Sequence, residues 1–262
     1  RAHPMPGERP RPPCKSRMPG YKRLMETGST DPSSKRRSGN EFGAARPMRL
    51  SGRGDYFDMM LVDHGFIRSG IYANRHWVTR DVIRSSQPSP AQLRGFAARG
   101  GKAVLNLRGA RDCGSYRQEV DACAELGLEL VNFPIRSRGA PEREHLHGLK
   151  AIFDTISVPM MMHCKSGADR AGLAAALYLH FREGQHMDRE AAQLSLRFGH
   201  VRSAKAGILD HFLETYIEAH AETGVAFLDW VDTAYDPVAM QNAFNSRLWW
   251  GNILVDNILR RE

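Results

Sequence analysis

From residue 81 to residue 163 the sequence alternates short apolar runs with stretches of helical character, and this alternation restricts the fold more than any other feature. Ser89 followed by Pro90 is a helix start signal, and Gly127 is a helix stop signal. We predict strands at 81–84, 102–107, 128–135 and 159–163, and helices at 89–99, 115–126 and 142–156. Strand, helix, strand is the pattern of an α/β domain, so we expect a central, mostly parallel sheet flanked by helices.

After residue 170 the sequence predicts helices alone, at 171–183, 188–198, 205–222, 226–233 and 237–259. The last of these is amphipathic, because Phe244, Leu248, Trp249 and Ile253 fall at helical spacing beside Arg247. A helix of this kind packs on its own domain or on a second subunit, or it lies on a membrane surface. We therefore predict a folded domain over residues 55–223, which includes an N-terminal extension, and a helical C-terminal extension over residues 224–262.

The first 54 residues differ in composition from the remainder. They hold 13 Lys and Arg against 4 Asp and Glu, with 8 of the 14 prolines, whereas the other 208 residues hold 24 basic and 25 acidic side chains. Residues 1–54 are therefore predicted to be a disordered basic tail. Because the folded part is almost neutral, we do not expect nucleic acid as a partner.

Two further observations bear on location. The apolar runs are far shorter than the roughly 18–20 residues that a membrane-spanning helix needs, which excludes an integral membrane protein. Four scattered cysteines indicate a reducing compartment and no disulfide framework. We expect a cytoplasmic location, with peripheral membrane contact through the C-terminal helix as an open alternative.

The segment after the last predicted strand carries the chemistry, and it reads His163-Cys164-Lys165-Ser166-Gly167-Ala168-Asp169-Arg170. A tight turn after a strand directs backbone N–H groups inward, and the N-terminus of the next helix adds more N–H groups and a positive dipole. Gly167 permits the turn, and the guanidinium of Arg170 can hold two phosphate oxygens at once. At the base of this positive cup, Cys164 should be a thiolate placed for in-line attack on phosphorus.

This spacing resembles the Cys-x5-Arg loop of the protein tyrosine phosphatase and dual-specificity phosphatase superfamily, His-Cys-x-x-Gly-x-x-Arg. Two upstream stretches are similar to bacterial dual-specificity-like phosphatases: Ile-Arg-Ser-Ser-Gln-Pro at 83–88 and Val-Leu-Asn-Leu-Arg at 104–108. The resemblance covers roughly residues 76–200. It implies a dual-specificity-phosphatase-like fold with a helical C-terminal part, and a cysteine-dependent phosphatase domain over residues 55–223.

The resemblance also implies a role for each residue of the loop. Cys164 is the implied nucleophile, which forms a cysteinyl-phosphate, and Arg170 binds the phosphate and stabilises the charge of the transferring group. His163 is expected to orient the loop by hydrogen bonding. No cofactor or metal is implied. The implied phosphate-binding residues are Lys165, Ser166, Gly167, Ala168, Asp169 and Arg170.

The sequence departs from the family pattern at two points. Ala171 stands where many members carry Ser or Thr, whose hydroxyl helps the thiolate to leave, so we expect slow turnover with Ser166 as a partial substitute. The loop that supplies the general acid in the family corresponds to residues 134–144, which contain no Asp. Asp169 is the preferred acid, because an Asp before the loop Arg resembles the myotubularin and Sac-type phosphatases. The alternatives are Glu142, Glu144, Asp112 and a substrate-assisted route.

The substrate is open at this point. The upstream motifs favour a protein phosphatase that acts on phosphotyrosine or phosphoserine, and this is the preferred interpretation. Lys165, Asp169 and the amphipathic C-terminus favour a phosphorylated lipid or inositol instead, with Lys165, Arg136 and Arg138 as a basic rim. Two further classes stay open, a pseudophosphatase that binds phosphate without hydrolysis and a rhodanese-type sulfur transferase.

Overall fold

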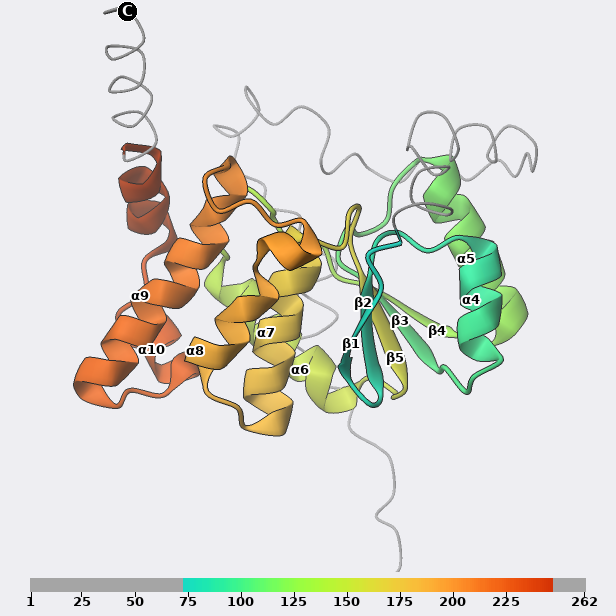
Figure 1. Cartoon of the computed structure of the whole chain (residues 1–262), viewed down its shortest axis with the longest axis horizontal. Helices are drawn as coiled ribbons and strands as arrows, with labels where there is room; N and C mark the ends of the chain where they lie inside the picture. Colours follow the sequence, from blue (N-terminus) through green and yellow to red (C-terminus); the bar gives the residue numbers. More distant parts are fainter. Residues whose placement is uncertain (1–72, 247–262) are drawn as a thin grey trace, which may run out of the picture. The chain divides into compact units, whose positions relative to one another are not determined.

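The computed structural model describes residues 73–246, in which a five-stranded sheet is covered by helices on both faces (Figure 1). The predicted tail at 1–54 and the last part of the predicted C-terminal helix lie outside the described residues. In chain order the elements are β1 (His76–Thr79), β2 (Val82–Ser85), α4 (Pro90–Ala97), β3 (Ala103–Asn106), α5 (Gly114–Leu126), β4 (Glu129–Asn132), α6 (Arg143–Thr155), β5 (Met160–His163), α7 (Asp169–Glu183), α8 (Met187–Glu190), the 3-10 helices η3 (Ala191–Gln193), η4 (Leu196–Phe198) and η5 (Lys205–Gly207), α9 (Ile208–Thr223) and α10 (Phe227–Thr233).

The strand order is β1-β2-β5-β3-β4, and every pair is parallel except the β1-β2 hairpin. The chain moves outward from β2 to β3 and β4 through α4 and α5, and it returns to the centre of the sheet through α6. This reversal places α4 and α5 on one face and α6 on the other, as right-handed crossovers require (Figure 1). The prediction of a mostly parallel sheet between helices is confirmed.

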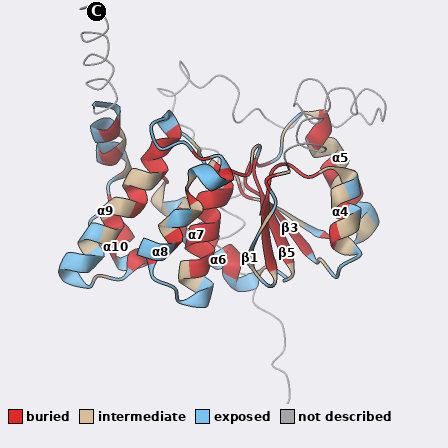
Figure 2. Ribbon diagram, viewed as in Figure 1, coloured by how far each residue is buried: buried red, intermediate tan, exposed pale blue. Residues whose placement is uncertain are grey.

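Side chains of the central strands alternate between two hydrophobic cores. Ile83 of β2 and Met161 of β5 pack with Leu93 and Phe96 of α4 on one face. Their strand neighbours point to the opposite face, into a larger core that includes α6, α7, α9 and α10. All four residues of β2, β3 and β5 are buried (Figure 2). This burial on both faces explains the continuous apolar runs at 103–105 in β3 and 160–162 in β5, whereas β2 also contains the buried polar residues Arg84 and Ser85.

Residues 188–198 were predicted as one helix, and this is wrong. The structure contains the short helix α8, then η3 and η4, with Leu194 and Ser195 in non-helical conformations between them. The interruption frees the backbone carbonyls of Gln193 and Phe198, which accept hydrogen bonds from side chains elsewhere in the fold. Helical periodicity cannot reveal a break that depends on such tertiary contacts.

The edge strand β1 was not predicted, because residues 55–80 were interpreted as a mixed N-terminal extension. It pairs with β2 in an antiparallel register that shifts between Trp77 and Thr79. Trp77 is 62% exposed. A four-residue edge strand with an irregular register leaves no alternation of apolar and polar residues in the sequence.

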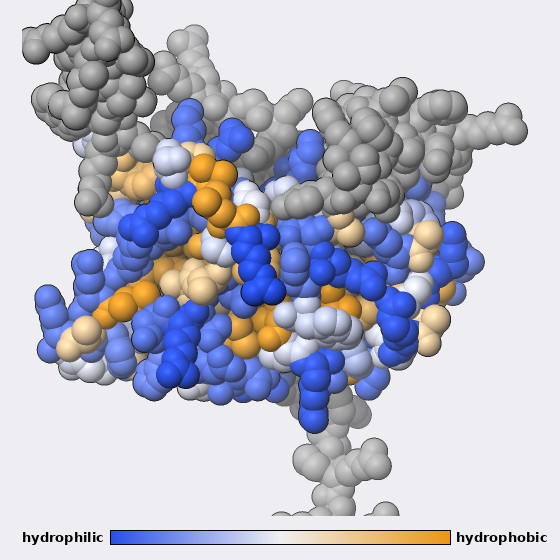
Figure 3. Space-filling model, viewed as in Figure 1, coloured by the Kyte–Doolittle hydropathy of each residue, from blue (hydrophilic) through white to orange (hydrophobic). Residues whose placement is uncertain are grey.

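The described part of the C-terminal region shares the larger core. Trp230, Tyr235, Met240 and Phe244 belong to the same cluster as α7 and α9, and the Tyr235 hydroxyl donates to the carbonyl of Pro141 at 2.7 Å. Among the described residues no helix is long and apolar enough to cross a membrane. On the face shown in Figure 3, hydrophilic side chains surround smaller apolar patches.

Candidate active site

The four parallel strands end at the same level in a row of polar residues. Ser85 is paired with His163, His163 with Asn106, and Asn106 with Asn132. Ligand sites in open α/β sheets lie beyond the carboxyl ends of the strands, where the strand order reverses. The loop between β5 and α7 lies at this edge, and it contains the predicted site residues.

All the predicted loop residues are brought together in this turn, which we call the phosphate loop (residues 164–170). Cys164 is 2% exposed, and the backbone N–H of Gly167 donates to its Sγ at 3.2 Å. Gly167 and Ala168 are buried, whereas Lys165 is exposed. An N–H group that donates to sulfur stabilises a negative charge there, so the loop is suited to hold a thiolate.

Gly167 is required by the geometry of the loop. Its φ is +75°, and a Cβ at this position would lie 2.7 Å from the carbonyl carbon of Ser85 and 2.7 Å from the amide nitrogen of Ser86. Both neighbours are backbone atoms that cannot rotate away. Any other residue would therefore displace the phosphate loop from the end of β2.

Arg170 is the last residue of the phosphate loop and lies in the first turn of α7. Its Nε is buried and has no hydrogen-bond partner within residues 73–246. A buried guanidinium N–H without an acceptor is costly unless an anion supplies one. The donor therefore fits a phosphate held at the N-terminus of α7.

Arg84 supports the phosphate loop from behind. It is fully buried, and its Nη2 donates to the carbonyls of Gly167 at 2.8 Å and Ala168 at 2.9 Å. Its Nη1 donates to the Gln193 carbonyl at 2.7 Å, and the guanidinium lies 4.1 Å from the ring centroid of Phe198. We call residues 191–200 the bracing segment. Arg84 thus connects this segment to the loop.

Two other donors reach the loop from the same side. The Asn74 side chain donates to the carbonyl of Ser166 at 2.9 Å and to that of Phe198 at 2.8 Å, so it joins the loop to the bracing segment. The backbone N–H of Gln87 donates to the Lys165 carbonyl at 3.3 Å.

These contacts fix the direction of the loop's backbone. The carbonyls of residues 165–168 all accept bonds from donors behind the loop. In a trans peptide the C=O and the following N–H point in opposite directions, so the N–H groups of residues 166–169 face the other side. The bond from Gly167 N–H to Cys164 Sγ shows that this is the side of the sulfur. The result is a cup of N–H donors around Cys164, which is an anion-binding arrangement.

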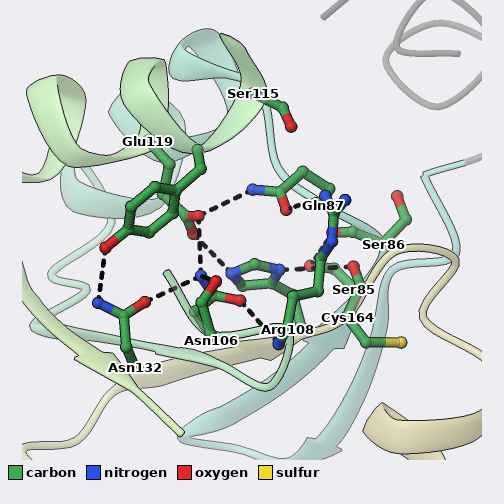
Figure 4. A network of polar contacts seen from close by, with 12 residues as sticks. Ser85, Ser86, Gln87, Asn106, Arg108, Ser115, Glu119, Asn132 and Cys164 are labelled. Atoms are coloured by element: carbon green, nitrogen blue, oxygen red, sulfur yellow. Dashed lines mark hydrogen bonds and ion pairs between the residues drawn. The ribbon is translucent and has the colours of Figure 1, made fainter. Parts of the chain in front are cut away.

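A buried polar network supports the strand end beside the cup (Figure 4). His163 Nε2 lies 2.5 Å from Glu119 Oε1, and both side chains are fully buried. The other oxygen of Glu119 accepts from Gln87 at 2.9 Å, and Gln87 accepts from Arg108 at 2.7 Å. In Figure 4 the sulfur of Cys164 points away from this network. The predicted role of His163 in orienting the loop fits this position, with Glu119 as the partner that sequence reasoning missed.

Asp169, the preferred general acid, has a partner that the sequence did not indicate. Its Oδ1 lies 2.7 Å from His200 Nδ1, and His200 Nε2 lies 2.6 Å from Asp210 Oδ2. Burial lowers the pKa of His200, but the hydrogen bonds and charges of Asp169 and Asp210 outweigh this effect and raise the pKa to about 9. The imidazole of His200 is therefore protonated at neutral pH, and it forms an ion pair with Asp169.

The other candidate acids lie on the surface. Glu142 is the N-cap residue of α6 and lies 3.5 Å from Arg136 in a half-exposed ion pair. Glu144 is exposed in the first turn of α6. Asp112 is exposed and pairs with Arg117 at 2.6 Å. Within residues 73–246, none of these three forms a hydrogen bond or ion pair with a residue of the phosphate loop.

A cavity of about 390 Å³ lies beside the phosphate loop. Asp169 forms part of its wall, and Arg138, one of the predicted rim arginines, is also in the lining. The sequence did not single out Lys205 as a site residue. The lining residues are Arg138, Asp169, Gly199, Val201, Ala204, Lys205 and Ala206.

No group of His, Cys, Asp and Glu side chains within the described ranges could hold a metal ion. The supporting residues missed by sequence reasoning, Asn74, Glu119 and His200, lie far from the loop in sequence. Asn74 is 92 residues from Ser166, and His200 is 31 residues from Asp169. Arg84 belongs to the motif at 83–88, which does not by itself indicate the role of this side chain.

This cup of N–H groups around a cysteine, followed by an arginine in the first turn of a helix, is an arrangement that can bind a phosphate group. The family described as "DSP-PTPase phosphatase fused to NAD+ Kinase" matches residues 73–208, just over half of the chain. The chain belongs to this family, and it is a phosphatase that hydrolyses phosphoesters.

Several solved structures are similar to this one. Tk-PTP in its active form shares 19% identity with a TM-score of 0.43, over 57% of this chain and 99% of that chain. TpbA from P. aeruginosa shares 18% identity with a TM-score of 0.44, over 57% and 91%. The core catalytic domain of the PP-IP phosphatase SIW14 from S. cerevisiae shares 14% identity with a TM-score of 0.45, over 58% and 94%. A comparison with curated proteins found no match.

Proposed function

We propose that this chain hydrolyses phosphomonoesters through a cysteinyl-phosphate on Cys164, and that it acts as a tyrosine or dual-specificity protein phosphatase. The observation that carries the proposal is the direction of the loop's N–H groups, which face the sulfur because the loop carbonyls are bonded behind it. A phosphate bound in the cup meets the sulfur at its floor. We assign the catalytic domain to residues 55–223 and its place of action to the cytoplasm, where a cysteine nucleophile stays reduced.

The reaction has two steps. The thiolate of Cys164 attacks phosphorus, an S–P bond forms, and the ester P–O bond breaks as the leaving oxygen takes up a proton. Water then attacks the phosphorus and the S–P bond breaks. Inorganic phosphate is released, and the thiolate of Cys164 is regenerated. Arg170 and the loop N–H groups hold the three equatorial oxygens in both steps and stabilise their charge.

The second step has less assistance than in many members of this superfamily. Ala171, at the position of the usual hydroxyl residue, is fully buried in the first turn of α7. No side-chain donor at this position can help the thiolate to leave. We expect hydrolysis of the cysteinyl-phosphate to limit turnover, and in the extreme case the chain would bind phosphate as a pseudophosphatase.

The source of the leaving-group proton decides which substrates react well. Because Asp169 Oδ1 is paired with His200, we assign the proton to Glu142, Glu144 or solvent. A series of aryl phosphates of increasing leaving-group pKa distinguishes these cases, because loss of an acid slows poor leaving groups most. If Asp169→Asn slows poor leaving groups much more than good ones, Asp169 is the acid.

A second candidate is a substrate that carries another anionic group near the reacting phosphate, such as a phosphorylated lipid or inositol. The cavity beside the loop favours it, because Arg138 and Lys205 are both in the lining. Two cations beside a phosphate loop suit a polyanionic substrate, whereas a phosphotyrosine peptide requires only one anion site.

A phosphate-release panel tests these candidate substrates. It compares phosphotyrosine and phosphoserine peptides, soluble inositol phosphates, phosphoinositide vesicles and p-nitrophenyl phosphate, with Cys164→Ser as the control. We expect turnover by the wild type and none by Cys164→Ser, which still binds orthovanadate. Turnover of the same substrates by Cys164→Ser would overturn the cysteine mechanism, and vanadate binding without any turnover by the wild type would show a pseudophosphatase.

A further inference from the structure

His200 makes two short contacts that connect the phosphate loop to the helical part of the fold. The ring is 1% exposed, and each nitrogen faces one carboxylate: Nδ1 faces Asp169 at 2.7 Å, and Nε2 faces Asp210 at 2.6 Å. Asp169 begins α7, and Asp210 lies in the first turn of α9. We propose that His200 is a positioning residue that holds the carboxylate of Asp169, and with it Arg170 and the end of the phosphate loop, in the phosphate-receiving conformation.

Because Asp169 is next to Arg170 in the chain, its contact with His200 also affects the position of the Arg170 guanidinium. Asp169 directly precedes Arg170, and both belong to the first turn of α7. Ala168, the N-cap residue of α7, makes no side-chain cap bond. Arg84 and Asn74 join the loop to the bracing segment indirectly, whereas the side chain of Asp169 contacts that segment directly. A shift of Asp169 would rotate the backbone of the turn and move the guanidinium of Arg170. Displacements near 1 Å reduce catalysis about 100-fold.

Charge supports the same role. A carboxylate in the loop repels an incoming phosphate dianion unless a cation neutralises it. The protonated ring of His200 lies between two carboxylates and is almost fully buried, so it neutralises Asp169 at close range. Of the charged residues around it, Arg202 forms a separate pair with Glu214 at 2.6 Å. The arrangement makes Asp169 an anchor of the loop, not a proton donor to the leaving group.

Two substitutions separate the two contacts of His200. The side-chain amide of Asn places its nitrogen near the position of Nδ1, and that of Gln places its nitrogen near the position of Nε2. His200→Asn should therefore keep a donor for Asp169, and His200→Gln should keep one for Asp210. Both variants lose the positive charge and one contact, so their stabilities should be similar.

This inference rests on the proposed function, and the difference between the two variants tests it. For p-nitrophenyl phosphate we expect kcat/KM to fall about 10- to 100-fold in His200→Gln and less in His200→Asn. The affinity for inorganic phosphate, measured from the increase of Tm that it causes, should fall in the same order. Equal losses in both variants, or a wild-type phosphate affinity in His200→Gln, would overturn the positioning role.

His147→Gln is the matched control. His147 forms the same kind of contact, with Asp232 at 2.7 Å, but both side chains are exposed and lie outside the loop. We expect wild-type kcat/KM and phosphate affinity in this variant. Because phosphate affinity requires no turnover, it tests the role of His200 even if the proposed hydrolysis is wrong. If His200→Gln does not fold, Asp169→Ala, which removes the contact and keeps the histidine, should show the same loss of phosphate affinity, and an unchanged affinity there would overturn the proposal.

Discussion

The phosphate loop and the bracing segment both serve phosphate binding, but they differ in how their residues are arranged along the chain. The loop presents N–H groups, a thiol and a guanidinium to the substrate, and these come from seven consecutive residues. The bracing segment holds the loop in place through Arg84, Asn74 and His200, which come from three separate parts of the chain. The first region is recognisable as a motif, whereas the second exists only after the chain has folded.

This difference shows that the residues facing the substrate do not by themselves hold the loop in its conformation. A seven-residue turn that directs several N–H groups to one side leaves its carbonyls on the other side, and buried carbonyls need donors. Arg84 supplies two of those donors, and Asn74 supplies another. A substitution in either region should therefore reduce catalysis, but only one in the bracing contacts should do so mainly through stability and loop position.

Arg170→Lys tests the loop side of this comparison and should have the largest effect. An ammonium group cannot reproduce the planar pair of donors, so we expect kcat/KM for p-nitrophenyl phosphate to fall about 1000-fold, with little change in Tm. The control is Arg182→Lys, in a surface pair with Asp154 at 3.2 Å, which should retain full activity. A kcat/KM within threefold of the wild type would remove Arg170 from phosphate binding.

Gly167→Ala affects both regions, because the added Cβ would contact the backbone of Ser85 and Ser86 at 2.7 Å. We expect about 100-fold lower kcat/KM and a loss of roughly 2–4 kcal/mol in the free energy of unfolding. Gly184→Ala is the matched control, since its φ is +65° and nothing lies within 4 Å of the added Cβ. It should cost only about 1 kcal/mol and leave activity intact. Equal losses of activity and stability in the two variants would show that the close approach of Gly167 to the backbone of Ser85 and Ser86 is not important.

Arg84→Met tests the bracing contacts. The methionine fills much of the volume but removes the Arg84 donor from the carbonyls of Gly167 and Gln193, and it leaves the Ala168 carbonyl with the N–H of Gly172 alone. We expect a loss of about 3 kcal/mol in unfolding free energy by chemical denaturation, and about 10-fold weaker vanadate binding in the folded protein. Unchanged vanadate affinity would mean that the loop keeps its shape without this support.

The pH dependence of stability tests the His200 contacts. The pKa of His200 is raised from 6.5 to about 9 in the folded protein, because Asp169 from α7 and Asp210 from α9 contact its ring. Its contribution, on the order of 3 kcal/mol, should be complete below pH 6.5 and be lost as the pH rises through about 9. The difference in unfolding free energy between wild type and His200→Gln should therefore shrink over this range. A difference that is constant with pH would show that the ring is neutral.

Arg138→Ala and Lys205→Ala should have the smallest effect and test the cavity beside the loop. For p-nitrophenyl phosphate we expect kcat/KM within about twofold of the wild type, because a single phosphate needs neither cation. For an inositol bisphosphate we expect KM to rise about 3- to 10-fold if the cavity receives the second anion. If the variants and the wild type have equal KM values for the inositol bisphosphate, the cavity does not receive a second anion, and a singly phosphorylated protein stays the preferred substrate.

Much of the framework could be predicted from the sequence, because it depends on local patterns. The runs that form β2, β3 and β5 are buried on both faces, and the start of α4 carries a capping box at Ser89 and Gln92. The phosphate loop could be predicted because its residues are consecutive and each has a chemical reason to be there.

The supporting contacts could not be predicted, since they depend on tertiary structure. His200 is a single histidine beside Gly199, with no partner nearby in sequence to mark it. Asp169 was the preferred acid on its position before Arg170 alone, and its contact with His200 could not be seen in the sequence. The break at Leu194 and Ser195 also has no local signal, because the hydrogen bonds from Arg84 and Asn74 that use the freed carbonyls come from distant residues.

The most direct test of the mechanism is to trap the covalent intermediate. The enzyme is mixed with a phosphorylated substrate, quenched in acid within one turnover and digested, and the peptides are examined by mass spectrometry. With Ala171 in place of the usual hydroxyl residue, the intermediate should accumulate, so we expect one phosphoryl group on the peptide that contains Cys164 and none in Cys164→Ser. Steady hydrolysis with no phosphoryl group on Cys164 at any quench time would contradict the cysteinyl-phosphate mechanism.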